Sequence, residues 1–196
     1  MKTRQQITDE YIAALQRNDL PPCYRTWDIK PWFTADDTAK DSYFKTVESN
    51  PIADALIKQT GAKVETRRWV GRWEPEVDTV VIPERFRFYT TGHFYETLFR
   101  LLSYWAEQRV GIFEHHENRD CPFWNLVASL NSSFVCNELN IPAGQPLEEK
   151  AAWLQSFLEE RSTDTDLINY AAEKANVIAD FLLSFRSPQS NSKSDN

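Results

Sequence analysis

Apolar residues recur along most of this chain with the three- and four-residue spacing of amphipathic helices. This spacing predicts helices over residues 3–18, 51–60, 92–109, 122–139, 146–160 and 165–185. Helix punctuation supports some of these bounds, because Pro21 and Pro22 follow the first helix and Pro51 suits the first position of the second. Gly61 can adopt the left-handed conformation in which many helices end. The pattern therefore predicts a mostly helical protein.

Two short segments have the composition of β-strands instead. They span residues 63–69 and 78–83, and Pro83 closes the second. The serine- and asparagine-rich end of the chain, residues 187–196, is predicted to be disordered. Together these patterns predict an α+β fold class that is predominantly helical, with a small sheet.

Composition and charge limit the classes of function. The 196 residues carry a formal net charge of −7, which disfavours a general electrostatic grip on DNA. The cysteines, Cys23, Cys121 and Cys136, are too widely spaced for a disulfide framework or a zinc ribbon. No segment has the apolar length of a signal peptide core or a membrane span. We therefore expect a cytoplasmic protein with reduced cysteines and no membrane partner.

Several short motifs follow one another in a distinctive order. A predicted helix ends in Thr60-Gly61-Ala62, a strand follows, and the next motif is Asp78-Thr79-Val80-Val81-Ile82-Pro83. Residues 94–98, 124–136 and 170–183 continue the series. In this order and spacing the motifs resemble the C-terminal zincin-like metallopeptidase domain of the ArdC family of plasmid and phage antirestriction proteins. The resemblance covers about residues 50–186.

The resemblance implies a domain organisation. Residues 36–186 are expected to form the zincin-like domain with a small edge sheet, followed by the disordered tail. Residues 1–35 contain a helix and a Trp- and Pro-rich arm, and they resemble the start of the family's N-terminal single-strand-DNA-binding domain. Most of that domain has no counterpart, because too few residues separate Trp32 from Thr60.

Family members carry the zinc motif H-E-x-x-H on the helix predicted here at 92–109. In that motif two histidines chelate zinc and the glutamate acts as general base. By resemblance, the corresponding positions hold Phe99, Arg100, Ser103 and, for the third ligand, Ser129 or Asn125. Phenylalanine has no lone pair, serine is a poor zinc ligand, and arginine repels a dication. The resemblance therefore implies an inactive metallopeptidase that uses no metal and no cofactor.

A scaffold of this kind is expected to act by binding a protein, such as a component of a host defence or transfer system. Zincin substrates lie along an edge strand, which places the expected surface on the second strand and the segment after it. That segment mixes the cations and aromatic rings typical of interface hot spots: Arg85, Phe86, Arg87, Phe88 and Tyr89. Arg100 is expected either to pair with Glu96, four residues earlier, or to bind an anion or a partner's carboxylate.

Two alternatives remain open. The first is a module that binds single-stranded nucleic acid, which proteins can hold by alternating cations and aromatic rings. Such a pattern occurs in Arg67, Arg68, Trp69, Arg72 and Trp73, although Glu65 and Glu74 offset its charge. A hydrolase with a rebuilt metal site would draw its ligands from His93, His115, His116, Glu117 and Cys121. Adjacent histidines point apart in regular structure, so a solvated loop is the simpler interpretation of His115 and His116.

Overall fold

The computed structural model describes residues 1–20, 47–68, 70–112 and 122–186. Within these ranges the α-helices are α1 (Arg4–Leu15), α2 (Pro51–Thr60), α3 (Thr91–Val110), α4 (Pro122–Glu138), α5 (Leu147–Leu158) and α6 (Thr165–Leu183). The strands are β1 (Lys63–Thr66), β2 (Arg72–Glu74) and β3 (Thr79–Ile82), and the 3₁₀ helices are η3 (Pro75–Val77), η4 (Arg85–Arg87) and η5 (Glu159–Thr163). The predicted fold class, α+β and predominantly helical, is confirmed.

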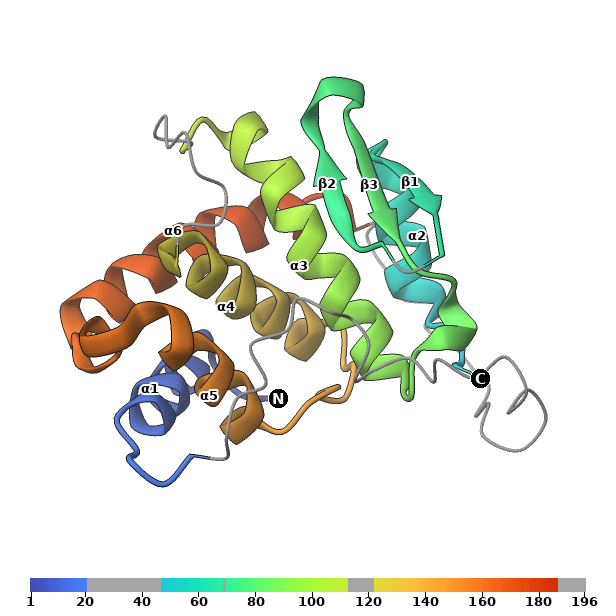
Figure 1. The fold of residues 1–196 in the computed structure, drawn as a ribbon. Coiled ribbons are helices and arrows are strands. Elements are labelled where there is room, and N and C mark those ends of the chain that lie inside the picture. Colours follow the sequence, from blue (N-terminus) through green and yellow to red (C-terminus); the bar gives the residue numbers. More distant parts are fainter. Residues whose placement is uncertain (21–46, 69, 113–121, 187–196) are drawn as a thin grey trace, which may run out of the picture.

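The long helix α3 lies at the centre of the molecule. The small sheet packs on one side of it, and α4 packs on the other (Figure 1). Helix α6 contacts both α3 and α4, while α1 and α5 lie side by side beyond α4. Phe99 and Leu102 of α3 and Leu126 and Leu130 of α4 are fully buried where these layers meet. Any residue on α3 that faces inward is therefore enclosed by protein.

The sheet has the strand order β1-β3-β2, with β1 parallel and β2 antiparallel to β3. All four residues of the central strand β3 are buried, which explains its unbroken Thr-Val-Val-Ile sequence. Strand β2 was not predicted as a separate element. It is three residues long and its ends, Arg72 and Glu74, are charged, so its sequence shows little strand character.

Helix α1 packs into the same core as the rest of the described chain. Ile7, Tyr11 and Leu15 are buried against α4, α5 and α6. Arg4 pairs with Glu138 of α4 and with Asp180 of α6, each at 2.7 Å. The predicted boundary between the arm and the zincin-like domain, at residue 35, lies outside the described residues, as does the predicted disordered tail. That division of the chain stays a prediction.

No helix of the described ranges combines the length and the apolar content needed to cross a lipid bilayer.

The start of α3 is held by direct contact between two backbones. A Cβ atom added at Gly92 would lie 2.1 Å from the carbonyl oxygen of Pro142. One added at Gly144 would lie 2.3 Å from the Cα and N atoms of His93. The connection between α4 and α5 therefore lies directly against the first turn of α3, and neither Gly92 nor Gly144 has room for a side chain.

Replacing Gly92 with alanine is expected to lower the free energy of unfolding by about 3 kcal/mol or more, because the added methyl group overlaps a fixed backbone carbonyl. Urea unfolding followed by circular dichroism measures this loss. Gly111→Ala is the matched control: its φ is +69° with nothing within 4 Å of the added Cβ, so only the left-handed backbone costs about 1–2 kcal/mol. Equal losses in the two variants would contradict the close backbone contact.

Candidate functional site

Phe99 and Ser103, which the resemblance aligns with the two zinc-binding histidines, are both fully buried in α3. The Phe99 ring stacks on Tyr95, with the ring centroids 6.3 Å apart. The side-chain amide of Asn131 on α4 donates to the hydroxyl oxygen of Ser103 at 2.5 Å and to the backbone carbonyl of Phe99 at 3.3 Å. One amide from the facing helix therefore bonds to both former ligand positions.

Arg100, which the resemblance aligns with the general base, is half-buried. Its guanidinium carbon lies 5.3 Å from the ring centroid of Trp153 on α5, a cation–π contact. The expected pairing of Arg100 with Glu96 is wrong. Glu96 instead forms an ion pair with Lys150 of α5, with Nζ and Oε1 2.5 Å apart. Oppositely charged residues four apart on a helix often pair with each other. Here Glu96 pairs instead with a lysine from another helix.

The two candidates for the third ligand also have internal partners. The Tyr104 hydroxyl donates to Asn125 Oδ1 at 2.8 Å. The Tyr11 hydroxyl donates to the Ser129 backbone carbonyl at 3.4 Å and shares a hydrogen bond of 2.9 Å with Ser133. A divalent metal needs carboxylate, imidazole or thiolate ligands at these positions, and the chain offers a phenyl ring, a guanidinium, hydroxyls and an amide. The residues present do not fit the metal of a zincin.

Part of the alternative metal site can be located. His93 is buried in the first turn of α3, and burial, with the nearby charges of Arg100 and Lys150, lowers its pKa to about 4. The other proposed ligands, His115, His116, Glu117 and Cys121, lie outside the described residues. Within the described ranges, no three His, Cys, Asp or Glu side chains come together as a metal site would require.

Comparison with known proteins places this geometry in a family. The profile of a zincin-like metallopeptidase family matches residues 51–174. The chain belongs to this family. A crystal structure of the antirestriction protein ArdC from plasmid R388, in its Mn(II)-bound form, is similar with a TM-score of 0.59 and 25% identity, covering 73% of this chain and 55% of ArdC. The metal-free form gives a TM-score of 0.58 and 26% identity, covering 71% and 52%. The resemblance to the ArdC zincin-like domain is thus confirmed.

The chain spans about half the length of the ArdC structures that it matches. No curated protein matches it significantly.

The segment predicted to bind a partner is only partly exposed. Arg85 pairs with Asp54 of α2 at 2.8 Å and lies over the Phe94 ring, 4.4 Å from its centroid. Arg87 pairs with Glu84, and its side chain is 12% exposed. Phe88 is buried and packs edge-on against His93 and Phe94. Phe86 and Tyr89 are the exposed members of the set, at 51% and 44%. The arginines and Phe88 therefore help to build the fold.

Asp54 is the centre of this local network. Burial would raise the pKa of its carboxyl group, but hydrogen bonds from Ser49, Tyr95 and Arg85 outweigh that effect and lower the pKa. Helices α2 and α3 and the η4 turn are joined through this one carboxylate. Reversing the charge of Arg85 would place two anions together there, so such a variant cannot test partner binding without disturbing the fold.

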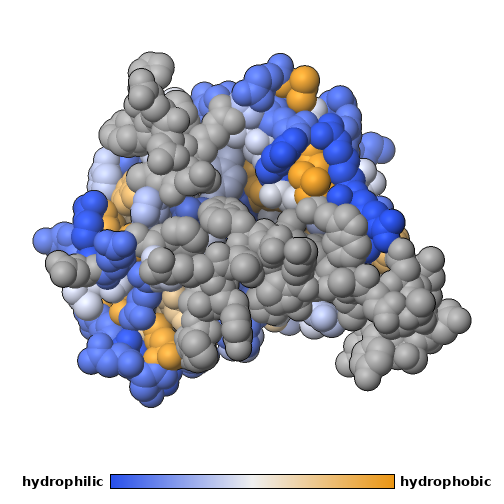
Figure 2. All heavy atoms as spheres, in the orientation of Figure 1, coloured by the Kyte–Doolittle hydropathy of each residue, from blue (hydrophilic) through white to orange (hydrophobic). Residues whose placement is uncertain are grey.

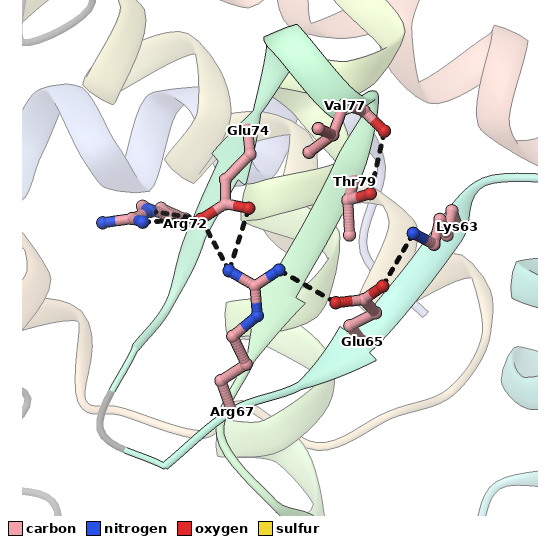
Figure 3. Close-up of polar contacts among 7 residues, drawn as sticks. All are labelled: Lys63, Glu65, Arg67, Arg72, Glu74, Val77 and Thr79. Carbon is pink, nitrogen blue, oxygen red and sulfur yellow. Dashed lines mark hydrogen bonds and ion pairs between the residues drawn. The ribbon is translucent and has the colours of Figure 1, made fainter.

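The cations proposed to bind nucleic acid form an ion-pair network on the outer face of the sheet (Figure 3). Arg67 contacts Glu65 at 2.9 Å and Glu74 at 2.8 Å, and Arg72 contacts Glu74 at 2.6 Å. Trp73 is buried, and Trp69 lies outside the described residues. Arg68 lies close enough to Glu84 to lower the pKa of that carboxyl group, together with the stronger effect of Arg87. Among the described residues of this pattern, Arg67 and Arg72 are thus paired with carboxylates of the sheet.

Glu107 is a buried acid that the sequence marked only as a less well placed partner for Arg100 than Glu96. It lies one helical turn after Ser103 on α3 and is 2% exposed. Its Oε1 atom has no hydrogen-bond partner in the described part of the chain. Burial raises the pKa of its carboxyl group to about 8, so the neutral form predominates at pH 7. The only available sequence signal was its position on the same helical face as Ser103.

The buried Glu107 predicts an unusual pH dependence of stability. Its pKa is higher in the folded state, so the folded protein holds a proton that the unfolded chain releases at the same pH. The stabilisation that this proton gives is complete below about pH 4.5, and it is lost as the pH rises to about 8. Wild-type stability should therefore fall relative to Glu107→Gln over this range, with a slope of at most ~1.4 kcal/mol per pH unit. Urea unfolding at several pH values measures the difference.

The exposed acid Glu173 on α6 provides the control. Glu173→Gln makes the same chemical change at an exposed position and should follow the wild-type curve at every pH. A constant difference between wild type and Glu107→Gln from pH 5 to pH 8 would show that Glu107 is hydrated in the folded protein.

Proposed function

We propose that this chain is a catalytically inactive, metallopeptidase-like protein of a plasmid, phage or other mobile element that acts by binding a protein. The observation that carries the proposal is the bonding of Asn131 to both former zinc positions, Phe99 and Ser103. These contacts use the helix faces on which the family would hold its metal. Arg100, in place of the general base, cannot accept a proton from water at neutral pH.

The biological context follows from the ArdC similarity. ArdC from plasmid R388 is an antirestriction protein, and the similar region covers most of this chain. On this basis we assign the chain to counter-defence, or to the regulation of transfer, with a host defence or transfer component as its partner. The retention of the scaffold without its ligands is expected of a protein whose remaining role is recognition.

Phe86 and Tyr89 are our candidates for direct partner contact. Both are large and well exposed, and they lie on either side of the anchored residues Arg87 and Phe88. Exposed aromatic side chains on a rigidly held turn are typical of interface hot spots. On the face shown in Figure 2, hydrophobic residues among the coloured atoms form small, separate patches between hydrophilic ones. A short turn presenting two aromatic rings fits contact through a few strong residues better than a broad apolar interface.

The nucleic-acid alternative receives less support. Arg67 and Arg72 are already neutralised by Glu65 and Glu74, and phosphate binding would have to break these ion pairs (Figure 3).

Titration with Zn²⁺ or Mn²⁺ is expected to show no stoichiometric binding, and EDTA should leave the melting temperature unchanged, because no set of ligands remains on α3 and α4. Isothermal titration calorimetry and elemental analysis of protein purified without chelator measure this. One zinc per chain, lost on mutation of His115 or His116, would instead favour the rebuilt hydrolase.

Expression of the chain in cells with an active restriction system should raise the transformation efficiency of unmodified plasmid DNA. The double variant Phe86→Ser/Tyr89→Ser should lose this protection, because loss of two hot-spot rings weakens binding by about tenfold or more. Val177→Ser is the matched control, since Val177 is 44% exposed on α6, away from η4. Full protection by the folded double variant would show that the partner binds another surface. Equal loss of protection in all variants would show that the substitutions act by destabilising the fold.

A further inference from the structure

Four helices meet around one buried ammonium group. Lys150 of α5 has a side chain that is 13% exposed, and its Nζ lies 2.5 Å from Oε1 of Glu96, whose side chain is 9% exposed. An ion pair this deep in a protein is costly unless other polar groups complete its surroundings. The structure supplies such groups from the two remaining helices.

Tyr11 of α1 and Cys136 of α4 both interact electrostatically with Lys150. Burial would lower the pKa of the lysine, but these two groups and Glu96 outweigh burial and raise it. Cys136 is itself buried, and the Tyr11 hydroxyl shares a hydrogen bond with Ser133. The cation is therefore paired with one carboxylate, while a phenol and a thiol lie near enough to influence its pKa. These are oxygen and sulfur groups of the kinds that also bind metal ions.

This junction adjoins the positions from which the zincin ligands are missing. Glu96 is one helical turn before Phe99 and Arg100 on α3. Tyr11 donates to the backbone carbonyl of Ser129, a third-ligand position. Arg100 lies over Trp153, one turn after Lys150 on α5. The helix that carries two of these positions, α3, is thus joined to α5 through a lysine beside the same site.

We propose that this junction is a cation site whose occupant is part of the chain, with the Lys150 ammonium taking the structural place that a bound metal has in the family. An ammonium on a tethered side chain can neutralise Glu96 and hold α5 against α3, and it needs no metal supply. This role goes beyond partner binding and does not depend on it.

The proposal predicts that an emptied site will accept an external cation. Lys150→Ala removes a fragment equivalent to n-propylammonium and leaves Glu96 buried without its partner, so the melting temperature should fall by roughly 10 °C. Millimolar n-propylammonium or Mn²⁺ should restore at least half of that loss while leaving the wild type unchanged. Lys150→Ala/Glu96→Gln lacks the anion and should not respond to either cation.

Lys174→Ala is the matched control, because Lys174 lies over the ring of Tyr170, an exposed residue of α6, away from the junction. It should change the melting temperature little and show no rescue. If neither cation raises the melting temperature of Lys150→Ala above its effect on this control, the proposal is overturned.

A second pair of variants tests the site if Lys150→Ala does not fold. Lys150→Arg keeps a cation at the junction, whereas Lys150→Met keeps comparable length and removes the charge. Lys150→Arg should melt several degrees above Lys150→Met, because only the arginine can neutralise Glu96. Equal melting temperatures, or a more stable methionine variant, would show that the junction needs no cation.

Discussion

The enclosure of α3 determines much of the rest of this structure. The sheet covers one side of the helix, α4 and α6 cover another, and α5 reaches it through Lys150 and Trp153. A polar side chain on an enclosed helix must find its partner within the protein. Ser103 finds Asn131, Glu96 finds Lys150, and Arg100 rests on Trp153. Glu107 has no hydrogen-bond partner for Oε1 among the described residues, and its burial raises the pKa of its carboxyl group.

The helices could be predicted closely because their signals are local. Pro51 at the start of α2 and the left-handed Gly61 at its end lie where the sequence places them, and the period of α3 gives its length to within a residue or two. Strand β2 could not be predicted, because three residues with charged ends carry no alternating pattern. It forms because β3 needs a second neighbour to satisfy its backbone.

The candidate site was predictable in one respect only. The resemblance singled out Phe99 and Ser103, and the structure shows both residues buried on α3. Their new partners could not be found from sequence, because Asn131 is 28 residues from Ser103 and Lys150 is 54 residues from Glu96. Contacts between helices depend on how the helices are arranged, and no local period records that arrangement.

Sequence patterns of cations and aromatic rings did not show which of these side chains are exposed and available for binding. The chain holds 29 acidic and 22 basic residues, so most arginines can find a carboxylate nearby. Arg67 and Arg72 do so within the sheet, Arg87 does so with Glu84 beside the η4 turn, and Arg85 does so with Asp54 of α2. What distinguishes Phe86 and Tyr89 from their neighbours is exposure, which only the folded structure reveals.

The ion pairs of Arg4 have a consequence for the folding of the protein during its synthesis. Arg4 at the start of α1 reaches Asp180 near the end of α6, 176 residues later in the chain. During synthesis, α1 leaves the ribosome before α6 and lacks this partner until α6 has been translated. The apolar face of α1 then remains exposed for most of that time, a state open to chaperones and proteases. Removing the last turns of α6 would therefore leave α1 without this ion pair.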